Sequence, residues 1–482
     1  MSKETVEKMR YIFEPESIAV IGASQDMADF GGWALQRPMT TGYRGMIYPV
    51  NPRRDKILGL KCFKSVLDIP GPVDLAVIVV KAQLVPSVMA ECVKKGVKAA
   101  IIMSSGFAEV GEEGRKLQEE TLRIAESGGI KFVGPNCLGV VSASGNLNFF
   151  FTQMPRSGSI SFVSQSGTLG IYLVNMAASK GYGFNKFISV GNSASLTLSD
   201  YMEYLGEDPG TRVIVMYLEG VRDGRRFIEV AREVVKKKPV VVYKGGRSAA
   251  GSRAAMSHTA SLSGADEVFD AVCRQVGIIR CEECFHPFEL AEALMGLPIA
   301  RGKRISIIGS GGQCLTTSDA CSMLGLELPE FDSETKKRLL ALLPEHAPVP
   351  TNPVDTAATR EVLLLPKLLD IILSLDYIDG CIIPGATGGG DTAENIRRLL
   401  AEGEGVVEML KKYNKPLVAY ALPGGQQVAL NILRRAGIPV YAVPEETARA
   451  MWGVMQYGEN RRKLEADEKE VGATVPNAVK TH

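Results

Sequence analysis

His258 is the residue of this chain that is best placed to do chemistry. It lies in a loop rich in glycine and serine, between an apolar strand expected at Val240–Tyr243 and a helix that begins near Ser263. Hydroxyl and basic side chains surround it, so the loop presents an imidazole to an anion. The structural alternative is that His258 caps the helix near Ser263 or bonds a backbone carbonyl.

A reactive histidine needs a partner that fixes its tautomer and raises its basicity, and a carboxylate at another strand end is the natural candidate. Glu219 directly follows the strand expected at Val213–Leu218, and Asp223 is the second choice. We therefore expect Glu219 to orient His258.

A predicted phosphate cradle consists of Ser164, Gln165, Ser166 and Gly167. These residues connect a strand ending at Val163 to a helix, where small residues leave N–H donors free and the helix dipole adds partial positive charge. Capping by Ser164 or Ser166 is the simpler alternative, and it is compatible with anion binding. The GxSxG pattern of a hydrolase nucleophile elbow is absent.

A second binding region is expected where the first strands end. Gly22, Ala23 and Ser24 form a strand-to-helix turn that is suited to a phosphate, although it is not a GxGxxG motif. Asn51 and Arg53 follow the next strand, and a guanidinium group favours phosphate. Because no acidic residue is placed to bind the ribose of NAD, a nucleotide-like ligand with an extra phosphate fits better. A merely tight turn remains the alternative.

Further residues lie at strand ends of the same predicted sheet, where ligands of parallel sheets usually bind. They are Ser104, Ser105, Gly106, Asn136 and Cys137. The serine hydroxyls are suited to contact a ligand chain. Cys137 is equally well explained as a small buried residue.

The elements that must position these residues alternate between short β-branched runs and helical patterns. Such alternation is typical of parallel sheets covered by helices on both faces. The pattern restarts twice, so we expect an α/β fold of three doubly wound domains at residues 1–150, 151–298 and 299–464, followed by a frayed tail at 465–482. In the third domain, the glycine loop Gly309–Gln313 suits phosphate binding and a tight turn equally.

Composition excludes several classes of function. The 482 residues carry 55 basic and 54 acidic side chains, and a formal net charge of +1 provides no field for nucleic acid or an anionic membrane. No apolar stretch reaches the roughly 18 residues of a membrane span, and a signal-peptide core is lacking, which predicts a cytoplasmic protein. Cys281, Cys284 and His286 suggest zinc, but no second pair follows at finger spacing, so no metal site is expected.

Five ordered motifs resemble the α subunit of the nucleoside-diphosphate-forming acyl-CoA synthetases, such as the ADP-forming acetyl-CoA synthetases, which are relatives of succinyl-CoA synthetase. The motifs are Phe13-Glu-Pro-Glu-Ser-Ile-Ala-Val-Ile-Gly-Ala-Ser24, Ser104-Ser-Gly-Phe-Ala-Glu109, Gly134-Pro-Asn-Cys-Leu-Gly139, Ser164-Gln-Ser-Gly167 and Ala255-Met-Ser-His-Thr259. Asn352-Pro-Val-Asp355 extends the resemblance more diffusely into the third domain.

The resemblance implies a Rossmann-like CoA-binding domain followed by two flavodoxin-like domains. It implies that His258 is a transiently phosphorylated histidine, that Glu219 is its orienting carboxylate and that Ser166 and Gly167 hold the phosphate. CoA would lie against Gly22, Ser24, Arg53 and Ser104–Gly106. Lys81 stands where the family often has proline and is a candidate for a CoA phosphate, or an ordinary exposed lysine. Ala260 stands where glycine is common.

The resemblance also implies partners. ADP, ATP and Mg²⁺ are bound in this family by an ATP-grasp module, which we expect on a separate β chain in an α2β2 hetero-oligomer, with CoA and a small carboxylic acid as substrates. A non-catalytic CoA-sensing protein of the same fold is the main competing hypothesis. An NAD-dependent oxidoreductase is a third, which the missing ribose carboxylate disfavours.

Overall fold

The computed structural model describes residues 3–253, 265–358, 363–384, 393–421 and 427–474. The chain divides into two compact units, Met1–Phe288 and Glu289–His482. The first unit contains two large sheets and the second contains one. The expected α/β fold built on parallel sheets is confirmed. The domain boundaries at residues 150 and 298 stay a prediction.

The first sheet has the strand order β2-β1-β5-β6-β7, and all of its pairs are parallel. Its strands are β1 (Ser17–Ile21), β2 (Met46–Val50), β5 (Leu75–Ile78), β6 (Ala99–Ile102) and β7 (Lys131–Val133). Its helices are α1 (Lys3–Phe13), α2 (Phe30–Thr41), α3 (Val85–Lys95) and α4 (Glu112–Ser127). Right-handed crossovers place α2 on one face and α3 and α4 on the other. A hairpin of β3 (Lys56–Ile57) and β4 (Leu60–Lys61) follows β2.

The helix α3 shows how closely the sequence pattern determines an element. Its apolar side chains Val85, Met89 and Cys92 recur at helical spacing and are buried in the core beneath the first sheet. Pro86 lies in its first turn, where a missing N–H costs nothing, and Gly96 ends it in the left-handed conformation at φ 78°. The expected helix and its glycine stop are confirmed.

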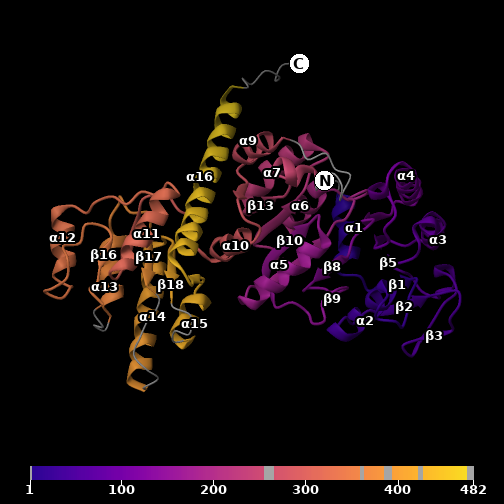
Figure 1. Cartoon of the computed structure of the whole chain (residues 1–482), viewed down its shortest axis with the longest axis horizontal. Helices are drawn as coiled ribbons and strands as arrows, with labels where there is room; N and C mark the ends of the chain where they lie inside the picture. Colours follow the sequence, from indigo (N-terminus) through magenta and orange to yellow (C-terminus); the bar gives the residue numbers. More distant parts are fainter. Residues whose placement is uncertain (1–2, 254–264, 359–362, 385–392, 422–426, 475–482) are drawn as a thin grey trace, which may run out of the picture. The chain divides into compact units, whose positions relative to one another are not determined.

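The second sheet has the order β14-β13-β12-β10-β11-β8-β9. Five parallel strands form its larger part: β10 (Ser157–Ser164), β11 (Phe184–Ser189), β12 (Val213–Leu218), β13 (Val240–Lys244) and β14 (Ile279–Cys281). Its helices are α5 (Gly167–Ser179), α6 (Leu198–Glu207), α7 (Gly224–Lys237) and α9 (Asp266–Val276), and α10 (His286–Gly296) follows β14. Figure 1 shows α5 on one side of these strands and α6 and α7 on the other.

Two antiparallel strands complete the second sheet. They are β8 (Gly139–Ser142), which pairs with β11, and β9 (Leu147–Asn148), which pairs with β8. These strands precede residue 150, yet they belong to the sheet that carries the predicted phosphate cradle. The turn after β7 therefore leads directly from the first sheet to the second.

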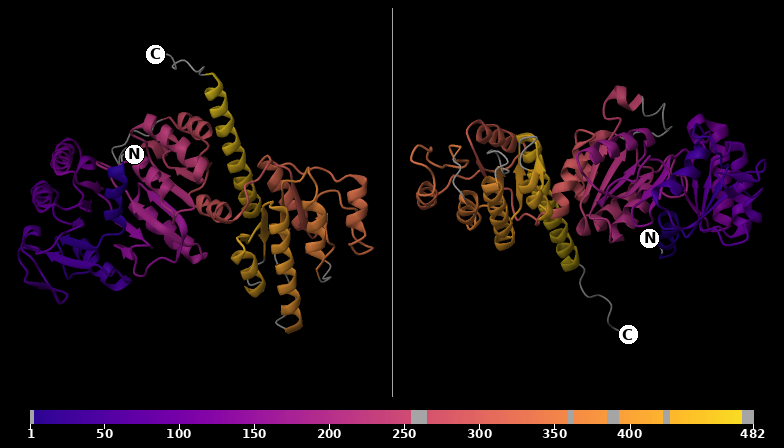
Figure 2. Two further views of the ribbon diagram at one scale, coloured as in Figure 1. Left: turned by 180° about the vertical axis from the view of Figure 1, so that it is seen from behind. Right: turned by 90° about the horizontal axis from the view of Figure 1, so that it is seen from below.

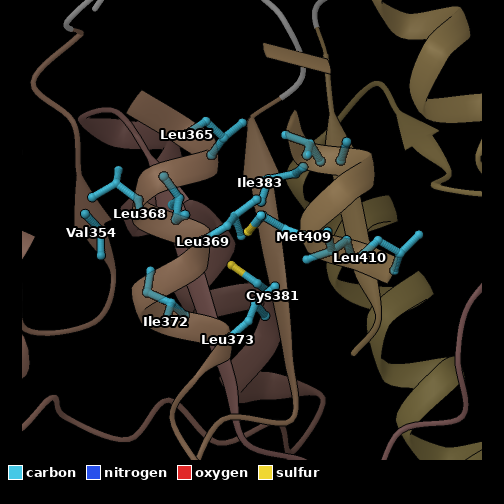
Figure 3. Close-up of a cluster of buried hydrophobic side chains, with 14 of the residues drawn as sticks. Val354, Leu365, Leu368, Leu369, Ile372, Leu373, Cys381, Ile383, Met409 and Leu410 are labelled. Atoms are coloured by element: carbon cyan, nitrogen blue, oxygen red, sulfur yellow. The ribbon is translucent and has the colours of Figure 1, made fainter. Parts of the chain in front are cut away.

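The third sheet is parallel and has the order β16-β15-β17-β18-β19. Its strands are β15 (Ile305–Gly309), β16 (Val354–Asp355), β17 (Gly380–Pro384), β18 (Leu417–Tyr420) and β19 (Val440–Tyr441). Its helices are α11 (Gly312–Met323), α12 (Ser333–Leu340), α13 (Leu364–Leu373), α14 (Ala393–Tyr413), α15 (Gln427–Arg435) and α16 (Pro444–Thr474). In Figure 3, Leu368, Leu369 and Ile372 of α13 lie against Cys381 and Ile383 of β17, and Met409 and Leu410 of α14 close the core.

The helix α16 extends further than the sequence predicted. It continues to Thr474 as one long helix (Figure 2), ten residues beyond Leu464, where we expected the tail to fray. Half of residues 465–474 are charged, and Arg461, one turn before this stretch, pairs with Glu465 at 3.2 Å. The helix thus continues although the segment lacks a periodic apolar face.

The glycine loop of the third sheet is tied to a neighbouring segment. The Gly311 amide donates to Asp355 Oδ2 at 3.1 Å, and the Ala358 amide donates to Ser310 Oγ at 2.9 Å. Both polar side chains are thus used within the fold, which favours the tight turn over the phosphate site for this loop. The neighbouring glycine loop at 385–390 lies outside the described residues.

Candidate functional site

The residues expected in the first binding region gather at one edge of the first sheet. Each follows the carboxyl end of a parallel strand: Gly22, Ala23 and Ser24 follow β1, Asn51 and Arg53 follow β2, Lys81 follows β5, Ser104, Ser105 and Gly106 follow β6, and Asn136 and Cys137 follow β7. We call this edge the first crevice. Its position matches the usual ligand crevice of open parallel sheets.

Glycine is required at the start of the first crevice. Gly22 has φ 92°, and a Cβ there would lie 2.2 Å from the Val79 carbonyl oxygen. A Cβ at Gly31 would lie 2.2 Å from the Gly22 carbonyl oxygen. The end of β1 therefore meets both β5 and the start of α2 at backbone contact distance, which no other residue type would allow.

Several of the expected side chains are used within the protein. Asn51 Nδ2 donates to the Ala23 carbonyl at 3.0 Å, and Ser104 Oγ donates to the Val80 carbonyl at 2.6 Å. Ala23 and Ser104 are buried. These groups shape the first crevice rather than face a ligand. In contrast, Arg53, Lys81 and Ser105 are exposed.

Cys137 is a buried residue of the fold. It is 4% exposed, and its thiol lies 3.3 Å from the Ile102 carbonyl oxygen. Burial raises the pKa of this thiol to about 12, so the reactive thiolate is not formed near neutral pH. The small-residue interpretation therefore holds for the side chain of Cys137.

Glu109 and Asn192 were not predicted as site residues, yet they organise the first crevice. Glu109 Oε1 accepts hydrogen bonds from the Gly106 and Phe107 amides at 2.6 and 3.1 Å, and its Oε2 accepts one from Asn192 at 2.6 Å. Burial acts to raise the pKa of Glu109, but these hydrogen bonds outweigh it and lower the pKa. The charged carboxylate thus fixes the loop after β6.

The predicted phosphate cradle forms at the start of α5. Ser166 is the N-cap, and its hydroxyl accepts a hydrogen bond from the Leu169 amide at 3.3 Å. Ser164 is fully buried and donates to the Ser166 carbonyl at 2.6 Å, so its side chain braces the turn. Ser166 and Gly167 remain at the helix N-terminus, where the helix dipole favours an anion.

Gln165 connects the cradle to the predicted orienting carboxylate. Its Oε1 accepts hydrogen bonds from the Glu219 and Gly220 amides at 2.5 and 3.1 Å, and its Nε2 donates to the Gly220 carbonyl at 3.1 Å. This side chain was expected to bind phosphate, but the structure uses all of these groups to position the turn after β12.

Glu219 is a buried carboxylate with one unused oxygen. Its side chain is 6% exposed, and Oε1 accepts a hydrogen bond from the Tyr217 hydroxyl at 3.3 Å. Its Oε2 is buried and has no hydrogen-bond partner among the described residues. A buried acceptor of this kind is costly unless another group completes it. Burial, followed by the neighbouring Glu219, raises the pKa of Tyr217, so this hydroxyl stays protonated and donates.

The second-choice carboxylate, Asp223, has another role. It is the N-cap of α7, and its Oδ1 accepts a hydrogen bond from the Arg226 amide at 3.1 Å. Aspartate before the first turn of a helix is a strong capping signal. Of the two candidate partners for His258, Glu219 therefore has a buried oxygen without a partner among the described residues, whereas Asp223 is exposed and caps a helix with one of its oxygens.

His258 lies outside the described residues, but both ends of its loop are anchored. At one end, buried Lys244 donates to the Gly245 carbonyl at 3.2 Å. At the other end, Asp266 accepts hydrogen bonds from Arg280 through both carboxylate oxygens at 2.7 Å. Arg247 lies near both ends, 3.9 Å from Asp266 and paired with Glu282. The base of this loop is thus an ion-pair network in which Lys244, Arg247 and Arg280 share the Asp266 carboxylate.

A cleft opens at the carboxyl ends of β10, β11 and β12. Its lining includes Gln165, Asn192, Ser199, Gly220 and Arg222. In the strand order, β11 and β12 flank β10 on opposite sides, which makes this edge the topological switch point of the second sheet. Among the residues that the structure describes, no group of three or more His, Cys, Asp or Glu side chains is arranged to hold a metal ion. In the same residues, no helix is both long and apolar enough to span a membrane.

Two family models match the chain. A CoA-binding domain model matches residues 16–143, and a model of the succinyl-CoA ligase-like flavodoxin domain matches residues 157–294. Together they cover the first sheet, every strand of the second sheet except β9, and the cradle. The expected assignment of CoA binding and a flavodoxin-like fold to these two regions is thereby confirmed.

Relatives match nearly the whole chain. The α subunit of acetate–CoA ligase [ADP-forming] II of Pyrococcus furiosus is 38% identical over 93% of this chain and 98% of its own length. Acetate–CoA ligase [ADP-forming] II of Archaeoglobus fulgidus is 36% identical over 95% of this chain and 68% of its own length. A solved structure of the dinucleotide-forming acetyl-coenzyme A synthetase 1 of Candidatus Korarchaeum cryptofilum, with phosphate and ADP, has a TM-score of 0.84 at 32% identity over 95% of this chain and 98% of that chain. The chain therefore belongs to the family of the α subunits of ADP-forming acetate–CoA ligases.

Proposed function

We propose that this chain is the α subunit of an ADP-forming acyl-CoA ligase and that it transfers a phosphoryl group through His258. A phosphate oxygen attacks the thioester carbonyl of acyl-CoA, and the CoA thiolate leaves, which forms an acyl phosphate. An imidazole nitrogen of His258 then attacks phosphorus, and the carboxylate of the acid leaves. Finally, an oxygen of the ADP β-phosphate takes the phosphoryl group and forms ATP. Each step is reversible.

The unused oxygen of Glu219 is the observation that carries this proposal. Glu219 Oε2 is buried without a partner among the described residues, on a turn that Gln165 ties to the cradle at the start of α5. An imidazole N–H donated to Oε2 would complete this acceptor and leave the other ring nitrogen free to attack phosphorus. Ser166 and Gly167 would hold the phosphate during transfer.

The ADP site is proposed to lie on a separate ATP-grasp β chain, which also binds Mg²⁺. The chain spans 98% of the Pyrococcus α subunit but only 68% of the longer Archaeoglobus ligase. Such a difference in coverage is expected if the Archaeoglobus ligase joins in one chain what is divided between two chains elsewhere. We propose an α2β2 assembly in which the loop of His258 carries the phosphoryl group to the β chain.

ATP formation from acyl-CoA, phosphate and ADP tests the proposal. The chain is combined with its β partner, and a panel of acyl-CoAs identifies the preferred acid. His258→Ala should abolish ATP formation, and Glu219→Gln should reduce it strongly, because the amide is a weaker acceptor for an imidazole that becomes charged. Undiminished turnover by His258→Ala would refute the phosphohistidine. CoA binding without any turnover would favour a CoA-sensing protein.

A further inference from the structure

Asn192 joins the two sheets of the first unit through its side chain. It follows β11 and is 9% exposed. Its Nδ2 donates to Glu109 Oε2 at 2.6 Å and to Gln118 Oε1 at 3.0 Å, and its Oδ1 accepts a hydrogen bond from Asn136 Nδ2 at 3.4 Å. Glu109, Gln118 and Asn136 all belong to the part of the chain built on the first sheet. One amide thus uses both of its donor hydrogens and its oxygen across the junction.

The backbone around Asn192 leaves its side chain little freedom to move away. The backbone N–H of Asn192 donates to the Pro135 carbonyl at 2.9 Å, and the backbone N–H of Ala194 donates to the Gly134 carbonyl at 3.0 Å. Gly191 has φ 55°, and a Cβ there would lie 2.2 Å from the Pro135 carbonyl oxygen. The loop after β11 is therefore packed directly on the turn after β7.

Glu109, which accepts a hydrogen bond from Asn192, fixes the loop that faces the first crevice. Glu109 accepts hydrogen bonds from Gly106 and Phe107 with its other oxygen, Oε1, so its carboxylate closes the loop after β6. Exposed Ser105 lies in the same loop. Asn192 also lines the cleft at the switch point of the second sheet. The contacts therefore form one path from the cleft, through Asn192 and Glu109, to the first crevice.

We infer that Asn192 is a positioning residue for CoA binding. Asn192 holds Glu109, and Glu109 in turn holds the Ser105–Phe107 backbone at the rim of the first crevice. Because Asn192 also lines the cleft of the second sheet, it couples the position of this loop to the cleft. The inference rests on the proposed function, in which CoA lies along the first crevice. The amide is required because a carboxylate at this position would face the charged Glu109 at hydrogen-bond distance.

Direct binding of CoA to the full chain, measured by calorimetry, tests the inference. Asn192→Asp should weaken binding by about tenfold or more at pH 7.5, because mutual repulsion of the two carboxylates disrupts the loop. As the pH falls, the pair can share one proton, so the Kd of this variant should approach that of the wild-type chain. A purely structural loss would not show this recovery with pH.

A second variant provides a rescue. Asn192→Asp combined with Glu109→Gln restores one amide and one carboxylate with exchanged positions, and the new amide at position 109 would retain an oxygen that accepts from Gly106 and Phe107. This double variant should recover most of the CoA affinity at pH 7.5 and lose the pH dependence. Ser195→Ala is the matched control, because Ser195 Oγ accepts a hydrogen bond from the Phe132 amide in the same junction at 3.4 Å without contacting Glu109. Its Kd for CoA should be unchanged.

The outcomes separate this inference from the proposed function. If the wild-type chain binds no CoA, the proposed function fails. If the wild-type chain binds CoA and Asn192→Asp binds it equally well at every pH, only the role of Asn192 is refuted. Weakened binding that the double variant does not rescue would equally refute it, since the exchange restores the interaction that the inference requires.

Discussion

Gln165 Oε1 accepts a hydrogen bond from the Glu219 backbone N–H at 2.5 Å, so a single side chain connects the predicted phosphate cradle to the predicted orienting carboxylate. The two residues are 54 positions apart in the sequence and lie on adjacent strand ends. Gln165 thus fixes the position of Glu219 without touching its carboxylate. In the proposed mechanism, Gln165 is therefore a positioning residue rather than a catalytic one.

Gln165→Ala should slow phosphorylation of His258 more than it lowers ground-state binding. Loss of the buried hydrogen bonds should cost about 1–3 kcal/mol, which corresponds to an about 5- to 150-fold lower rate if the loss is felt mainly in the transition state. Single-turnover phosphorylation measures the rate. Gln36→Ala is the control, since Gln36 is half-buried in α2 and its side chain has no hydrogen bond to another described residue. Equal rates for both variants would contradict this role.

Gly170, near the start of α5, should not tolerate a methyl group. A Cβ at Gly170 would lie 2.8 Å from the Phe187 ring and 3.0 Å from Ser164 Oγ, both of which are buried. Gly170→Ala should therefore lower the free energy of unfolding by about 1–3 kcal/mol and reduce phosphorylation, because the helix start must shift. Denaturant unfolding checks the first effect.

Gly224→Ala provides the comparison for Gly170→Ala. Gly224 begins α7, and a Cβ there would meet no atom within 4 Å. This variant should be unchanged or more stable by about 0.4–1 kcal/mol, because alanine restricts the unfolded chain. A similar loss of stability in both variants would show that packing at Gly170 is not the cause.

Two exposed cations at the first crevice should contribute to CoA affinity. Arg53→Ala and Lys81→Ala should each raise the Kd for CoA by about 5- to 100-fold, if each side chain makes one charge-assisted hydrogen bond to a phosphate. Lys98→Ala is the control, because Lys98 is also exposed but precedes β6 and so lies at the opposite edge of the sheet. Calorimetry at two salt concentrations measures these effects. Equal Kd values for CoA in all three variants would show that Arg53 and Lys81 do not contact CoA.

The buried pair Lys186–Asp208 should make stability depend on pH. Their charged atoms are 3.0 Å apart, and the side chains are 1% and 10% exposed. Burial acts to raise the pKa of Asp208, but hydrogen bonds from Thr211 and Lys186 together with the Lys186 charge lower it below 3.8. Because the folded-state pKa is depressed, the stabilisation is complete above the unfolded pKa near 3.8 and is lost as the pH falls through the folded value.

Asp208→Asn should therefore lower the free energy of unfolding by about 3–5 kcal/mol at pH 7, because it leaves a buried lysine uncompensated. The difference from the wild-type chain should shrink as the pH falls from about 5 to below the folded pKa. The exposed pair Lys64–Asp55, at 2.8 Å, provides the control. Asp55→Asn should leave the stability nearly unchanged at every pH, because an ion pair between exposed side chains contributes little. A pH-independent difference for Asp208→Asn would argue against an ionic role.

Local sequence patterns predicted the elements well. The strand at Ser17–Ile21 and the helix stop at Gly96 follow from β-branched runs and from the preference of glycine for the left-handed conformation. The strand β8 was missed because its partner β11 lies more than forty residues downstream, and a pattern within one segment carries no signal for such pairing. The two-residue strand β9 pairs only with β8 and was missed with it. Asp223 could have been recognised as a cap, since it directly precedes a helical pattern.

The candidate site was predictable in outline but not in its internal connections. Strand ends were identified because parallel strands direct their carboxyl ends to one edge. The sequence did not indicate that Gln165 holds Glu219, nor that Asn192 holds Glu109, because the partners are 54 and 83 residues apart. A lone asparagine after a strand has no distinctive spacing, so only the folded chain reveals Asn192.

An acid-labile phosphoryl adduct on the chain tests the central claim most directly. The chain, with and without its β partner, is incubated with phosphate and acyl-CoA, and its intact mass is followed alongside His258→Ala. We expect an adduct on the wild-type chain that disappears on mild acid treatment and never forms on the variant. Wild-type chain that binds CoA but acquires no adduct, or an equal adduct on His258→Ala, would contradict phosphoryl transfer through His258.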